Sequence, residues 1–263
     1  MSEEIKLTGC GCNDCDCDSI GQEIACEGKE SNEYMESRGP ISDVIRNRIE
    51  AAGSKFFCND NISEFLEPGD REELVDEVTE QMDSVLRSMV IDVNNDHNTH
   101  DTARRVAKMF INEVFAGRYD KAPKVTSFPN ASEYDGVYVV GPITVRSTCA
   151  HHFQPIYGHA WVGVYPDQKV IGLSKFNRII DWIASRPQIQ EEMTATIADE
   201  LAKFAETPHI AVVVKAEHFC MKMRGVKEAC SDTATAIMRG DFATKPGLKD
   251  EFYKLMNSMK GHG

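Results

Sequence analysis

Two stretches decide how this sequence is read: Ser147-Thr148-Cys149-Ala150-His151-His152 and, much later, Glu217-His218-Phe219-Cys220-Met221. Each follows a segment rich in valine and isoleucine, which is typical of a β-strand. We expect two cysteines and two or three histidines to converge from these stretches. The sequence therefore predicts a sheet that carries a metal site.

Two residues separate Cys149 from His152, a gap that lets a tight turn place both side chains on one ion. Cys220 would be the third ligand, and two thiolates with an imidazole suit zinc. In a catalytic site these three ligands leave one position open for water, and His151 and His218 would transfer protons nearby. We expect His218 and Cys220 to lie on one face of a strand. The alternative is a structural site with a second histidine as the fourth ligand, and the spacing does not choose between them.

A third stretch, Gly172-Leu-Ser-Lys-Phe-Asn-Arg178, indicates an anion site. Ser174 is predicted to cap a helix whose first N–H groups and dipole favour negative charge. Lys175 and Arg178 lie three residues apart on its polar side, and Arg224 follows Cys220 closely. The alternative is an ordinary capped surface helix.

Other charged residues have both a functional and a plain interpretation. Glu191 and Glu192 lie early in a helix predicted to start at Pro187, where acids complement the helix dipole. A carboxylate there could also accept two N–H groups from one face of guanine. Arg105 and Lys108 share a face of an earlier helix, and taken alone they are a solvated basic stripe.

The periodicity predicts an α+β fold with a largely antiparallel sheet. The expected helices are 42–52, 70–89, about 102–116, one from 174, one from 187, and 248–259. The expected strands are 137–140, 143–145, 160–164, 170–173, 210–214 and 233–238, and the two helices from 174 and 187 lie between strands.

Length and composition limit the class of protein. The chain has 263 residues, 41% of them hydrophobic, and shows no membrane-length apolar run and no signal pattern, so we expect a cytoplasmic location. The net charge is −13, and residues 1–39 carry ten Asp and Glu against three Lys and Arg, which argues against nucleic-acid binding.

Five of the nine cysteines fall in this segment, which we expect to be disordered, with thiols that bind a soft metal or do nothing specific. Cys58 and Cys230 are expected to be buried.

The stretch from Thr102 to Phe252 resembles the GTP cyclohydrolase I family. The matching motifs are Ser147-Thr-Cys-Ala-His-His-Phe153, Gly172-Leu-Ser-Lys-Phe-Asn-Arg178, Arg186-Pro-Gln-Ile-Gln-Glu191 and His218-Phe-Cys-Met-Lys-Met-Arg-Gly225. They occur in the family's order and approximate spacing. The resemblance implies conversion of GTP and water to 7,8-dihydroneopterin triphosphate and formate, the first step of pterin and folate synthesis.

The resemblance also implies roles for individual residues. Zinc would be held by Cys149, His152 and Cys220, and would activate the water that attacks guanine C8. The catalytic histidines would be His151 and His218. Guanine recognition falls to Gln190 and Glu191, and the triphosphate pocket to Ser174, Lys175, Arg178 and Arg224, with Arg105 and Lys108 supplied by a neighbouring subunit.

The implied architecture is the tunnelling fold, an antiparallel sheet with two helices on one face, assembled into a ring. The family forms a homodecamer of two pentamers with sites between subunits. We expect three regions: a Cys-rich acidic tail and linker (1–66), an N-terminal helical region (67–120) and a catalytic domain (121–263).

The chain departs from the family pattern at Ala150, where the family has Glu, at Glu192, where Arg is usual, and at Thr196, where Gln is common. These departures leave two alternatives open: a relative that acts on another purine nucleotide, and a non-catalytic zinc-stabilised ring that binds a nucleotide or a partner protein.

Overall fold

The main sheet has five strands in the order β5-β2-β3-β6-β7. The computed structural model describes residues 39–259. Neighbouring strands are antiparallel, except that β5 runs parallel to the last two residues of β2. The strands are β2 (Tyr138–Cys149), β3 (Pro155–Val164), β5 (Pro187–Gln188), β6 (Ile210–His218) and β7 (Thr233–Met238).

One face of this sheet is covered by two helices, α6 (Leu173–Ala184) and α7 (Gln190–Ala205). Alternate residues of a strand point to the same side, so Ile156, Ala160 and Val162 of β3 all contribute to the core under these helices. This core extends to Cys149, which anchors the end of β2.

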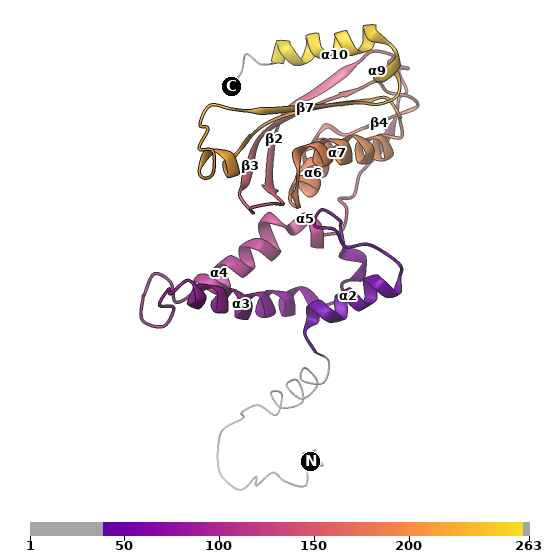
Figure 1. The fold of residues 1–263 in the computed structure, drawn as a ribbon. Coiled ribbons are helices and arrows are strands. Elements are labelled where there is room, and N and C mark those ends of the chain that lie inside the picture. The colour runs from indigo at the N-terminus through magenta and orange to yellow at the C-terminus, as the bar shows by residue number, and fades with distance from the viewer. Residues whose placement is uncertain (1–38, 260–263) are drawn as a thin grey trace, which may run out of the picture. The chain divides into compact units, whose positions relative to one another are not determined.

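The opposite face is covered in part by α10 (Pro246–Ser258), with the short α9 (Asp241–Thr244) before it (Figure 1). Trp161 of β3 packs there with Phe242 and Phe252, whose ring centroids lie 6.0 Å apart. The C-terminal helix predicted from periodicity is thus confirmed, and it completes a second hydrophobic core.

The helical region before the sheet begins with α2 (Ile41–Ala51), η1 (Ser63–Phe65) and α3 (Asp70–Ser88). It continues with α4 (Thr102–Met109), the π-helix η2 (Phe110–Val114) and α5 (Ala116–Tyr119). Arg186 joins this region to the sheet, because its guanidinium donates to the carbonyls of Gly117 and Asn59 at 3.0 and 3.2 Å. The central carbon of this guanidinium also lies 4.2 Å from the centroid of the Trp182 ring.

The mixed α+β class and the largely antiparallel sheet are confirmed, but several local predictions were wrong. The segments 137–140 and 143–145 form one strand, whose pairing register shifts between Val140 and Ile143. The strand predicted at 170–173 is present as β4 (Lys169–Ile171), but it ends before Gly172 and pairs with β1 (Ser127–Pro129) in a separate two-stranded sheet.

Two helix starts also differ from the predictions. Pro187 lies in β5, and α7 begins only at Gln190. Gly172 is the N-cap of α6, so Ser174 lies inside the first turn rather than at the cap.

Cys58 and Cys230 are exposed rather than buried. The predictions for the Cys-rich segment 1–38 lie outside the described residues, and the three-region division remains a prediction. No helix within residues 39–259 is long and apolar enough to cross a membrane.

Candidate metal centre and its surroundings

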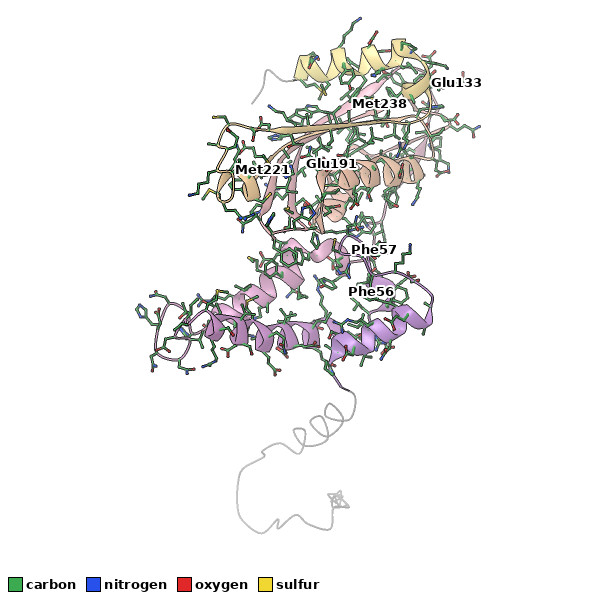
Figure 2. The ribbon with its side chains drawn as sticks, viewed as in Figure 1. Phe56, Phe57, Glu133, Glu191, Met221 and Met238 are labelled. Atoms are coloured by element: carbon green, nitrogen blue, oxygen red, sulfur yellow. The ribbon has the colours of Figure 1, made fainter. Side chains whose placement is uncertain are left out.

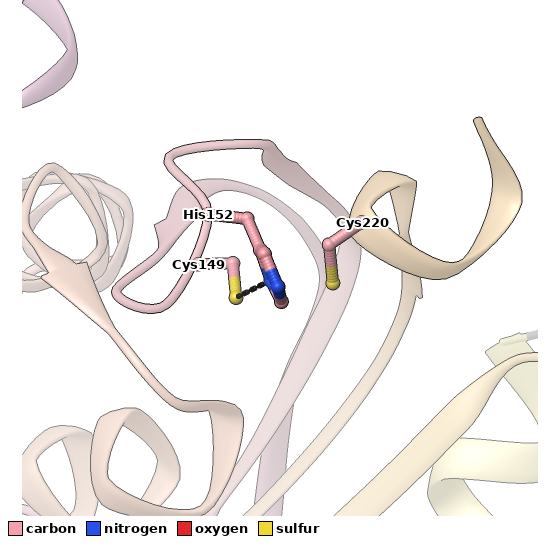
Figure 3. Close-up of side chains that lie close together, drawn as sticks. All are labelled: Cys149, His152 and Cys220. Atoms are coloured by element: carbon pink, nitrogen blue, oxygen red, sulfur yellow. Dashed lines mark hydrogen bonds between the residues drawn. The ribbon is translucent and has the colours of Figure 1, made fainter. Parts of the chain in front are cut away.

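The side chains of Cys149, His152 and Cys220 converge at one end of the sheet (Figure 3). Their potential ligand atoms, two Sγ and one ring nitrogen, all lie within 4.8 Å of one another. The Cys149 Sγ lies 3.9 Å from His152 Nδ1. The spacing argument therefore predicted a trio that the fold does bring together.

A turn at the end of β2 places the first two of these residues. The carbonyl of Cys149 accepts the N–H of Phe153 at 2.9 Å, and the N–H of Cys149 donates to Gln154 at 2.9 Å. Phe153 has a φ of +51°, the left-handed conformation that lets the chain reverse here. These bonds hold His152 over the buried Cys149.

Cys220 comes from the helical turn α8 (Phe219–Lys222), which directly follows β6. The prediction that His218 and Cys220 share a strand was therefore wrong, because the strand ends at His218. The helical turn instead brings the Cys220 thiol back toward Cys149 (Figure 3).

The electrostatics of the trio suit a cation. Burial raises the pKa of the Cys220 thiol, and the hydrogen bond and charge of the Cys149 thiol raise it further. Two adjacent thiols resist ionisation unless a positive ion lies between them. Two thiols with one imidazole are a donor set that fits zinc, and three protein ligands is the number found in catalytic zinc sites.

His218 ends β6 two residues before Cys220. Its Nε2 lies 2.8 Å from Oε1 of Gln190, whose side chain is fully buried. Burial lowers the pKa of His218, and the negative charge of Glu191 opposes this shift. His218, Gln190 and Glu191 thus form one group beside the trio.

Other predicted residues lie around this group. Glu191 is exposed in the first turn of α7, and Figure 2 labels it together with Met221 of α8. His151 is exposed, with its ring 6.1 Å from that of His152. The positive charge of Arg224 favours the thiolate of Cys220, which indicates that Arg224 is near. Glu192 accepts a hydrogen bond from Asn59 at 3.1 Å.

The remaining predicted residues are not brought to the trio within one chain. Arg178 lines a pocket of about 420 Å³ with Ile143, Thr144 and Arg146 of β2. Ile143 lies about 20 Å along the strand from Cys149, at about 3.3 Å per residue. Ser174 is one turn earlier on α6, and Lys175 donates to the carbonyl of Lys124 at 3.0 Å.

The basic pair of α4 is exposed as well. Arg105 forms an ion pair with Asp101 at 3.3 Å, and Lys108 lies one turn further along the helix. Within residues 39–259, no hydrogen bond or ion pair joins either side chain to the trio.

An aromatic cluster beside the metal centre was not predicted. Phe153 packs with Phe110 and Phe115, at centroid distances of 5.8 and 5.3 Å. Phe153 follows His152 directly, which was the available signal, but only the fold shows that its partners lie in and just after η2.

Comparison with known proteins gives a consistent assignment. The family model described as GTP cyclohydrolase I matches residues 78–257. A protein of Shewanella amazonensis named GTP cyclohydrolase 1 is 40% identical over 183 residues, which cover 69% of this chain and 84% of the relative. Proteins of the same name from Actinobacillus pleuropneumoniae and Yersinia enterocolitica are 41% and 39% identical, covering 69% and 68% of this chain and 83% and 81% of theirs. The chain therefore belongs to the GTP cyclohydrolase I family.

Proposed function

We propose that this protein is a zinc-dependent GTP cyclohydrolase I, which converts GTP and water to 7,8-dihydroneopterin triphosphate and formate. The observation that carries the proposal is the convergence of Cys149, His152 and Cys220 beside His218. It occurs in a chain whose relatives bear the name GTP cyclohydrolase 1 over more than 80% of their length. The product would enter pterin and folate synthesis.

The trio would hold the zinc ion. Bound zinc supplies Lewis acidity, which lowers the pKa of a water molecule and provides a nucleophile near neutral pH. His151 and His218 would move protons during opening of the imidazole ring of guanine. Glu191, exposed at the start of α7, would accept N–H groups of the base.

Binding of the triphosphate would require more than one copy of the chain. Arg178, Lys175 and Ser174 lie on the N-terminal half of α6, whereas β5, which follows the C-terminal end of this helix, pairs with Cys149. Together with Arg105 and Lys108 they would complete a site at the metal end of a neighbouring subunit. Arg224 would contribute from the same chain as the zinc ligands.

The sheet edges support a ring of copies. Within the described residues β7 pairs only with β6, and β2 is paired on its outer side only at Thr148 and Cys149. Such open edges can continue a sheet from one subunit to the next. We therefore propose the tunnelling fold with a ring assembly, as a homodecamer of two pentamers in the cytoplasm.

The test is incubation of the zinc-supplemented protein with GTP, following formate release and the fluorescence of the oxidised pterin. Both signals are expected. Formate without pterin means that ring opening proceeds but closure fails. If a folded, zinc-bound oligomer gives neither signal, the proposal is overturned.

A different purine nucleotide as substrate is the second candidate. Glu192, next to Glu191, accepts a hydrogen bond from Asn59, and Ala150 follows Cys149 where the family has an acid. A parallel incubation with 2′-deoxy-GTP separates the two. Faster turnover of this nucleotide than of GTP favours the second candidate.

A further inference from the structure

The buried amide of Gln190 has a defined orientation. Its Nε2 lies 3.1 Å from three possible acceptors: the carbonyls of Val214 and Thr233 and the hydroxyl of Thr235. Carbonyl oxygens only accept hydrogen bonds, so the NH2 group of the amide must face them. The amide oxygen is then left to face His218.

A second set of contacts supports this orientation. The Thr194 hydroxyl donates to the Gln190 carbonyl at 2.7 Å and lies 2.6 Å from the Thr235 hydroxyl. The only proton of the Thr194 hydroxyl is used in the bond to the Gln190 backbone carbonyl, so the Thr235 hydroxyl donates to Thr194. The Thr235 oxygen then remains free to accept from the Gln190 side chain. The donors and acceptors therefore agree with one another in a single arrangement.

From this arrangement we infer that Gln190 is a positioning residue that keeps the proton of neutral His218 on Nε2. The Gln190 Oε1 has no proton to give, so His218 Nε2, at 2.8 Å, must donate. The lone pair of the ring is then on Nδ1. Under the proposed function, Nδ1 is therefore the nitrogen that accepts a proton from the reacting groups.

This role differs from the recognition of guanine that the family resemblance implied for Gln190. Its side chain is 0% exposed and its polar atoms are all engaged by the protein. The neighbouring Glu191 is exposed and available to the base. The inference rests on the proposed function for its catalytic consequence, but the position of the proton can be measured without turnover.

The first measurement is the nitrogen NMR spectrum of the zinc-loaded full chain with labelled histidine. The signals of His218 are identified by their loss in His218→Asn. For the neutral imidazole of His218, we expect the Nε2–H form alone in the unchanged protein and a mixture of both forms in Gln190→Met. Methionine is similar in size to glutamine but has no amide. An Nδ1–H signal from the unchanged protein overturns the inference, whatever the activity.

Gln188→Met is the matched control. Gln188 is 1% exposed and donates to the carbonyls of Ile183 and Ala184 at 2.7 and 3.3 Å, but no contact with His218 is recorded. The substitution removes a buried amide of the same kind, so it should lower stability similarly and leave the Nε2–H signal in place. Loss of the signal in both variants would show that a general disturbance of the core is responsible.

Kinetics test the consequence. Gln190→Met should lower kcat about 10- to 100-fold, as is typical for loss of a residue that orients a functional group, with KM for GTP almost unchanged. In a His218→Asn background the same substitution should have no further effect, because both changes act on one group. A raised KM with unchanged kcat, or additive losses in the double variant, would instead assign Gln190 to guanine binding.

Discussion

At the scale of single residues, the two thiols of the metal centre differ from the other described cysteines in their surroundings. Cys220→Ser should reduce bound zinc at least about tenfold, because one of three ligands is lost, while the fold is retained. Cys230→Ser is the matched control, since Cys230 is exposed in the following loop. Metal content by atomic absorption and circular dichroism are the measurements. Equal zinc content in both variants would exclude Cys220 as a ligand.

Tyr138 presents a different residue-scale problem, because its hydroxyl is buried without a hydrogen-bond partner among the described residues. Burial raises the pKa of Tyr138 to about 12, from an ordinary value of 10.0. The unfolded chain therefore loses this proton at lower pH than the folded one, so the free energy of unfolding falls as pH rises from about 10 to about 12.

Tyr138→Phe should remove this part of the alkaline loss of stability and raise stability at neutral pH by about 1 kcal/mol, since an unsatisfied buried hydroxyl is removed. Urea unfolding at pH 8 and in the alkaline range measures both effects. If the two proteins lose stability in parallel above pH 10, Tyr138 does not titrate as described.

At the scale of elements, the turn that carries His151 and His152 is held against η2 by Phe153. Each aromatic pair contributes about 0.5–1.5 kcal/mol. Phe153→Ala should therefore weaken zinc binding about tenfold, because the turn must be ordered when the ion binds. Competition with a chelator measures this affinity. Phe128→Ala, an exposed aromatic on β1, is the control and should have no effect.

The elements also show what the sequence could predict. Strands and helices with several alternating or periodic apolar residues, such as β3 and α10, were predicted because burial imposes that pattern. Pro187 and Cys220 were misplaced, because a two-residue strand and a four-residue helix are too short to show a period.

The residues of the candidate site also differ in how far the sequence could predict their contacts. Cys149 and His152 could be paired from local spacing, since a single turn joins them. The contact between Gln190 and His218 spans 28 residues and depends on how α7 packs on β6, which no local pattern contains.

At the scale of the whole molecule, the distance between Arg178 and the metal trio within one chain means that the proposed function requires active sites shared between copies. Arg178 lies beside the middle of β2, whereas Cys149 ends that strand. His218→Asn and Arg178→Ala should each lower GTP turnover strongly, for lack of a proton-transfer group and of a triphosphate contact respectively.

Co-expression of these two variants should restore up to about a quarter of the unmodified activity, because random assembly gives that share of sites with both residues intact. Formate release per assembled oligomer, compared with each variant alone, is the measurement. The control is the chain that carries both substitutions, expressed alone at the same level. It should remain inactive. If mixed oligomers form but stay as inactive as the single variants, His218 and Arg178 serve the same chain's site, and the ring is not required to complete it.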